Sequence, residues 1–80
     1  MDTFHVHKEF RINSATIQPG RARSISALHC LRECLDTCGC VAVNTRKKEP
    51  YVCEIVLHDN MNIVKKMPDT NWDVYSFIYV

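Results

Sequence analysis

Residues 29–44 read HCLRECLDTCGCVAVN and hold four of the five cysteines of this 80-residue chain. Cys30 and Cys34 lie four residues apart in a segment that neither glycine nor proline interrupts. In a helix, residues at that spacing lie on adjacent turns of one face, so both thiols point toward whatever that face packs against. Cys40 and Cys53 fall in short β-prone runs. Two disulfides from one helix to one sheet are therefore geometrically feasible.

The cysteine pair belongs to a predicted amphipathic helix. Ser24 and Ser26 offer N-cap oxygens before it. Gly39 is expected to end it, because glycine readily adopts the positive φ that helix exits often require. Apolar side chains recur at i, i+1, i+4, i+7 and i+8, as a sheet-facing stripe requires: Ala27, Leu28, Leu31, Cys34 and Leu35. The opposite face carries His29, Arg32, Glu33 and Asp36.

A strand is expected on the N-terminal side of this helix. Apolar and polar residues alternate over residues 4–12, which predicts a half-buried strand. Lys8 interrupts the apolar parity and indicates a bulge or an edge position. Residues 15–18 are interpreted as a short second strand, and Pro19-Gly20 after them as a turn.

More strands are expected after the helix. Residues 40–44 and 51–57 form apolar runs around the polar segment 45–50, a pattern typical of an antiparallel hairpin. Residues 58–71 are polar and are predicted to be a loop with at most one short strand, at residues 62–65. Aromatic and β-branched residues predict a last strand over residues 72–80. The fold class is thus α+β, with one helix on a sheet.

Length and composition narrow the class of protein further. Eighty residues form one domain, in which the core alone supplies only a few kcal/mol, so cross-links are often recruited. A net charge of +1 gives no general attraction to nucleic acid or to an anionic membrane. No apolar run approaches the about 18 residues of a membrane span, and the N-terminus lacks the features of a signal peptide. We expect residues 1–80 to be a single domain cut from a larger extracellular protein, without a cofactor.

Metal binding and catalysis are the rival interpretations of the thiols. Four cysteines, with His29 nearby, would supply soft ligands for zinc, but no Cys-x2-Cys knuckle is present. An intracellular zinc domain is therefore the lesser alternative. Cys38 with His29 or His58 would form a nucleophile pair only with a third orienting group, which the sequence does not offer, so we expect no enzyme. His5 and His7 are interpreted as the solvated side of a strand.

The run His29–Asn44, followed by Cys53-Glu54-Ile55-Val56-Leu57, resembles the core of a PAN/apple domain. The resemblance implies a curved antiparallel sheet that cradles one helix, paired terminal strands, and the bonds Cys30–Cys53 and Cys34–Cys40. Cys38 stands where the family usually has a turn residue, so a free thiol is expected there, with intermolecular pairing as the alternative. The sequence alone does not select one pairing, because Cys38 competes with Cys40 for the same partner.

The resemblance implies a non-catalytic adhesion module that recognises a protein or a carbohydrate outside the cell. A surface for sulfated polysaccharide would require the predicted hairpin tip and the exposed helix face to lie close together. Its candidate residues are Arg46, Lys47 and Lys48 at the tip, Arg32 on the helix, and Arg21 and Arg23 before it, and Lys65 and Lys66 form a further basic pair. A solvated turn is the plainer interpretation. The remaining alternative is dimerisation through Cys38 or a strand edge, and the oligomeric state is not defined by the sequence.

The aromatic residues near the C-terminus are expected to pack in the core and on the sheet, rather than to form a carbohydrate platform. They are Trp72, Tyr75, Phe77 and Tyr79. Loops 46–50 and 59–69 are the expected places for specificity, since loops carry recognition more often than the elements they connect.

Overall fold

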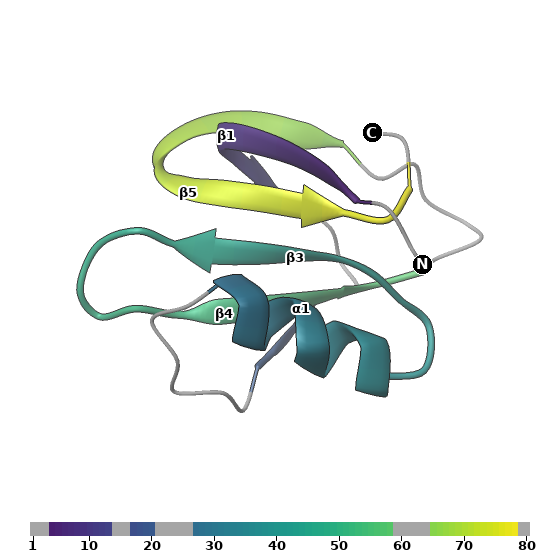
Figure 1. The fold of residues 1–80 in the computed structure, drawn as a ribbon. Helices are drawn as coiled ribbons and strands as arrows, with labels where there is room; N and C mark the ends of the chain where they lie inside the picture. Colours follow the sequence, from purple (N-terminus) through teal and green to yellow (C-terminus); the bar gives the residue numbers. More distant parts are fainter. Residues whose placement is uncertain (1–3, 14–16, 21–26, 59–64, 79–80) are drawn as a thin grey trace.

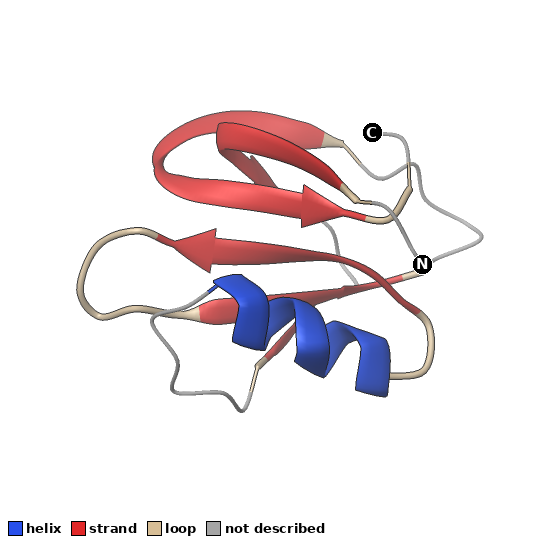
Figure 2. Ribbon diagram, in the orientation of Figure 1, coloured by secondary structure: helices blue, strands red, loops and turns tan. Residues whose placement is uncertain are grey.

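The computed structural model describes residues 4–13, 17–20, 27–58 and 65–78. Within these residues one helix packs on a five-stranded antiparallel sheet, as Figure 1 and Figure 2 show. The strand order is β1-β5-β3-β4-β2. The elements are β1 (His5–Ile12), β2 (Ile17–Pro19), α1 (Ala27–Asp36), β3 (Cys40–Arg46), β4 (Cys53–Leu57) and β5 (Lys66–Ser76). The predicted α+β class is confirmed, and the terminal strands β1 and β5 pair with each other.

The helix covers one half of one face of the sheet. α1 packs against β3 and β4, the hairpin that the two apolar runs predict (Figure 1). The core between them consists of Cys30, Leu31 and Cys34 from α1 and of Val43, Cys53 and Ile55 from the hairpin. Since side chains alternate along a strand, every second residue of β3, β4 and β5 lies on this side, which we call the helix face.

The opposite face is covered by the sheet's own ribbon of β1 and β5. These strands bend back together, as Figure 1 shows, because the pairing shifts between Lys8 and Phe10. Glu9 occupies the bulge with a positive φ of 64°. The interruption predicted at Lys8 is thus a bulge one residue later, in a strand that is also at the edge of the sheet. Beneath the ribbon lies a second core of Ile12, Ala42, Val56 and Val74.

A buried polar network holds the end of β1 on this second core. The Asn44 side chain accepts a hydrogen bond from the Ile12 backbone N–H and donates one to the Ile12 carbonyl, both at 2.9 Å. Asn44 also donates to Glu54 at 3.1 Å, and Glu54 accepts two hydrogen bonds from Arg11 at 3.0 and 2.7 Å. The Glu54 hydrogen bond raises the pKa of Arg11, whose guanidinium lies 4.4 Å from the centre of the Trp72 ring.

The described part of the helix is Ala27–Asp36. The proposed caps Ser24 and Ser26 lie outside the described residues. Gly39 has a φ of 83°, which confirms it as the exit of the helix. The predicted buried stripe is confirmed at Leu31 and Cys34 but is wrong at Leu28 and Leu35, which are 72% and 61% exposed. The cysteine side of the helix faces the sheet instead, and this rotates the two leucines onto its flank.

The C-terminal strand is longer than predicted. β5 begins at Lys66, six residues before the predicted start, and it includes Pro68, which pairs with Phe10. A proline is tolerated here because this part of β5 pairs only with β1 and its other edge needs no N–H donor. Most of the optional strand at residues 62–65 lies outside the described residues, and Lys65 is not in a strand.

The predicted turn at Pro19-Gly20 is also wrong. Pro19 lies in β2, which pairs with β4 at the edge of the sheet, where proline is again permitted. The Gly20 N–H donates to the Cys53 carbonyl at 2.7 Å and extends this pairing. Residues 15 and 16 of the predicted strand lie outside the described residues.

Candidate recognition surface

Both disulfides join the helix to the hairpin beneath it. Cys30 is bonded to Cys53, the first residue of β4, with 5.9 Å between their Cα atoms. Cys34 is bonded to Cys40, the first residue of β3, with a Cα separation of 5.3 Å. This is the pairing that the resemblance implies, and Cys38 is left as an exposed free thiol. Two disulfides in a small domain are typical of an oxidising compartment.

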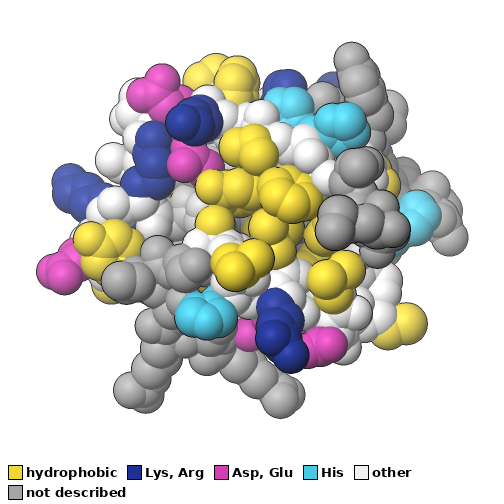
Figure 3. Space-filling model, viewed as in Figure 1, with side chains coloured by type: hydrophobic (Ala, Val, Ile, Leu, Met, Phe, Trp, Pro, Cys, Tyr) yellow, Lys and Arg dark blue, Asp and Glu magenta, His cyan; other side chains and the backbone are white. Residues whose placement is uncertain are grey.

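Those basic residues singled out from the sequence that the structure describes do not gather at one place on the helix face. Lys48 is exposed in the β3–β4 turn, while Lys47 forms an ion pair with Asp73 at 3.4 Å. Figure 3 shows basic side chains with acidic ones among them on the left of this face, and another basic and acidic group over α1, with hydrophobic and uncharged side chains between the two places. Arg46 ends β3 and Arg32 is exposed on α1. Arg21 and Arg23 lie outside the described residues.

Apolar side chains are exposed on the half of the helix face that α1 leaves uncovered. Phe4 and Val6 are each 44% exposed. Phe4 lies beside Tyr75 and Phe77, with ring centroids 6.0 and 6.3 Å apart. Val6 is paired with Tyr75, which is paired in turn with Val43, so all three lie in one row of the helix face. Tyr75 and Phe77 pack against the core under α1, as predicted, and with Phe4 they form a half-exposed aromatic floor. Trp72 is buried, and Tyr79 lies outside the described residues.

Leu28 and Leu35 extend this floor up the side of the helix. On the other flank of α1, Glu33 lines a cleft together with Gln18 and Pro19 of β2. The leucine flank is therefore the one directed toward β5 and β1, and Figure 3 shows hydrophobic side chains gathered between α1 and β5. We call this the apolar surface, which consists of Phe4, Val6, Leu28, Leu35, Tyr75 and Phe77.

One end of the apolar surface is charged. Asp73 pairs with Lys47, and its Oδ1 also accepts a hydrogen bond from the Glu9 backbone N–H at 3.0 Å. Lys8 is directly opposite Asp73 in the pairing of β1 with β5, so its exposed side chain lies on the same face. Desolvation, and then the Asp73 carboxylate, raises the pKa of Tyr75, while Lys47 acts in the opposite direction.

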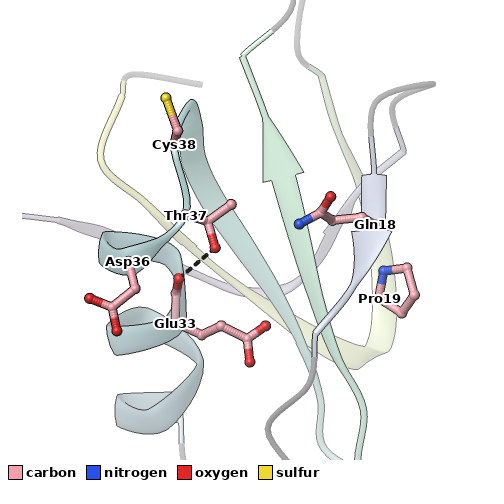
Figure 4. Close-up of a pocket in the computed structure, with 6 residues that line it drawn as sticks. All are labelled: Gln18, Pro19, Glu33, Asp36, Thr37 and Cys38. Carbon is pink, nitrogen blue, oxygen red and sulfur yellow. Dashed lines mark hydrogen bonds between the residues drawn. The ribbon is translucent and has the colours of Figure 1, made fainter.

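A cleft of about 400 Å³ lies on the other side of the helix, beside β2 (Figure 4). Its lining is polar and includes the carboxylates Glu33 and Asp36, the amide Gln18 and the thiol Cys38. The Thr37 hydroxyl donates to the Glu33 carbonyl at 2.7 Å and closes the end of the helix. In Figure 4 the thiol is directed away from the other lining side chains. None of the described residues that line this cleft is a histidine.

The prediction that His5 and His7 form a solvated pair is wrong for His7. Its Nδ1 lies 2.9 Å from Lys66 Nζ, and its Nε2 is buried without a hydrogen-bond partner. This contact exists because the ribbon bends back and brings the start of β5 under β1. Desolvation, followed by the charges of Lys66 and His5, lowers the pKa of His7. Among the described residues no group of three or more His, Cys, Asp or Glu side chains is arranged to hold a metal ion.

Comparisons with protein-family models, with curated proteins and with solved structures find no match for this chain. Among the described residues, no helix combines the length and the apolar composition that crossing a bilayer requires.

Proposed function

We propose that this chain is a non-catalytic, PAN/apple-like module of an extracellular protein and that it recognises a protein partner through the apolar surface. The observation that carries the proposal is the exposure of Phe4, Val6, Leu28 and Leu35 around two half-buried aromatic rings. Contiguous exposed apolar patches of this kind mark interaction sites on small soluble domains. The centres of protein interfaces are likewise rich in aromatic residues and poor in charge.

The surface rests on a scaffold that is suited to recognition. The two disulfides and the core of α1, β3 and β4 fix the helix against the sheet, so the leucine flank keeps its place relative to the aromatic floor. A preorganised surface loses less conformational entropy on binding than a mobile one. The same disulfides, and their agreement with the pairing implied by the resemblance, support an extracellular location and the kinship with PAN/apple domains.

A protein partner is favoured over a sulfated polysaccharide by the charges of the described residues. Polysaccharide sulfates require several cations that are free to converge on one strip. Lys47 is engaged by Asp73, and Arg11 by Glu54 beneath the ribbon. Figure 3 shows hydrophobic rather than basic side chains in the middle of the helix face. The contacts of this face therefore support apolar recognition, with charged side chains at its margins.

The proposal is tested with the oxidised chain, displayed as a tetramer against a defined panel of purified extracellular protein domains and, in parallel, against heparin. We expect a protein binder whose signal is lost in Leu35→Asp and kept in Lys48→Glu, which changes the charge by more at an exposed site in the hairpin turn. Binding to heparin alone would contradict the proposal if it resists Leu35→Asp, fails with Lys48→Glu and disappears at high salt.

The extracellular assignment has an independent test. A thiol assay on the denatured, unreduced protein should find one free thiol, that of Cys38, because the other four cysteines are bonded in pairs. Five free thiols, together with unfolding by a chelator, would replace the proposal with the zinc alternative. Electrophoresis with and without reductant would reveal dimers linked through Cys38.

A further inference from the structure

The helix face of the sheet has room for a second helix beside α1. Neighbouring strands lie about 4.8 Å apart, so five strands form a face roughly 20 Å wide. An α-helix with its side chains is about 10 Å across. Because α1 packs on β3 and β4, the strip above β5 and β1 that it leaves uncovered is about one helix wide.

The side wall of this strip has the spacing that helices use to pack against each other. Leu28 and Leu35 lie seven residues apart on α1, and they are 72% and 61% exposed. A seven-residue spacing keeps two side chains on one stripe of a helix, which is the repeat of helix–helix seams. The floor beneath them is apolar as well, since Phe4 and Val6 of the N-terminal segment lie beside Tyr75 and Phe77.

The charge at one end of the strip selects among possible occupants. Lys8 and Lys47 flank Asp73, whose Oδ1 is already engaged by Lys47 and by the Glu9 backbone. Among the described residues Lys8 forms no ion pair, so a carboxylate on the occupant would match its charge. A second copy of the chain fits less well. Its helix carries Arg32 between Leu28 and Leu35, and this residue would bring a positive charge rather than a carboxylate to the strip.

We propose that the apolar surface binds an amphipathic α-helix of the partner protein, which lies alongside α1 over β5 and β1. The helix presents apolar side chains at i, i+3, i+4 and i+7 to Leu28, Leu35 and the aromatic floor, and a carboxylate to Lys8 and Lys47. This inference rests on the proposed function and names the chemistry of its partner. An extended segment suits the strip less well, because extended partners add to the edge of a sheet through their backbone, whereas the strip is a face.

The test uses the full oxidised chain and a fluorescent 14-residue helical peptide, stapled to hold its conformation. The peptide carries leucines at i, i+3, i+4 and i+7 and two glutamates in its first turn. We expect saturable binding in fluorescence anisotropy, and at least a tenfold loss of affinity in the double variant Leu28→Ser/Leu35→Ser, since each leucine loses buried apolar area. Met67→Ser is the matched control, because Met67 is 54% exposed outside the apolar surface.

Charge is tested separately from apolar contact. Lys8→Glu should weaken the glutamate peptide several-fold and strengthen a peptide with lysines in place of the glutamates, while Lys48→Glu should change neither. Amide shifts in nuclear magnetic resonance spectra should cluster at Phe4, Val6, Leu28, Leu35 and Phe77. The same spectra show that each variant is folded, as expected from the exposure of the substituted side chains.

Three results would overturn the inference. They are absence of binding at millimolar peptide, equal affinity in Leu28→Ser/Leu35→Ser, and light scattering that shows a dimer of the chain abolished by Leu35→Asp. In the first two cases the proposed function survives if a panel protein still loses binding in Leu35→Asp, since that protein then uses a segment other than a helix. If no panel protein responds to Leu35→Asp, the proposed function fails as well.

Discussion

Replacement of Asn44 by alanine is expected to lower the free energy of unfolding by about 2–6 kcal/mol. The Asn44 amide satisfies both the N–H and the carbonyl of Ile12, a residue with no exposed surface. Alanine leaves these two buried backbone groups without that partner, at a cost of roughly 1–3 kcal/mol each. Glu54 also loses a hydrogen bond, although its two bonds from Arg11 remain.

The loss is measured by guanidinium unfolding of the oxidised protein, followed through the fluorescence of the buried Trp72. Asn13→Ala is the control, because Asn13 is exposed one residue beyond β1 and its loss should stay within about 0.5 kcal/mol. A loss below about 1 kcal/mol for Asn44→Ala, with the slope of the transition unchanged, would refute the reasoning. It would mean that the Ile12 groups find other partners and that the amide does not hold the ribbon of β1 and β5 on the second core.

The other predictions concern the disulfides, the helix exit and the half-buried His7. Replacing both cysteines of the Cys30–Cys53 bond by alanine should lower the free energy of unfolding by about 3 kcal/mol, because this bond closes a loop of 23 residues. The same change at the Cys34–Cys40 bond, which closes 6 residues, should cost about 2 kcal/mol. Equal losses in urea unfolding would contradict this argument from loop length. Gly39→Ala should cost about 1–2 kcal/mol by thermal unfolding and Gly39→Asn less, because a Cβ at Gly39 meets no atom and only the positive φ opposes it. The pKa of His7 is lowered in the folded state, so the unfolded chain binds the proton more tightly and stability should fall as the pH drops below about 6.5. His7→Gln should reduce the difference between urea midpoints at pH 7.5 and 5.0, and an unchanged difference would assign it to other groups.

The helix and the hairpin were predictable because short-range signals define them. Gly39 permits the exit of the helix, and the spacing of Cys30 and Cys34 places both thiols on one face of it. The alternation along the apolar runs of β3 and β4 directs every second side chain into the core beneath α1. Each of these features depends on residues only a few positions apart, and a sequence pattern records such features directly.

The features that define the candidate surface depend on long-range packing. Leu28 and Leu35 belong to the same apolar stripe as Leu31, and only the bonds to the sheet determine which part of that stripe is buried. Asn44 ends an apolar run and resembles a strand end, yet it is buried because β1 folds over it. Pro68 normally argues against a strand, and only its place beside β1 removes the objection. No pattern within one segment carries this information.

The position of the disulfides explains why a domain of this size leaves apolar side chains exposed. Both bonds join α1 to the β3–β4 hairpin, and none of the described cysteines lies on β1 or β5. The disulfides therefore hold the helix over β3 and β4, away from β5 and β1. A centred helix would bury more apolar area and would draw more of its stability from the hydrophobic effect. Here cross-links that restrict the unfolded chain replace part of that contribution. Leu28 and Leu35 therefore keep most of their apolar area exposed beside the aromatic floor, and this area remains available for a partner.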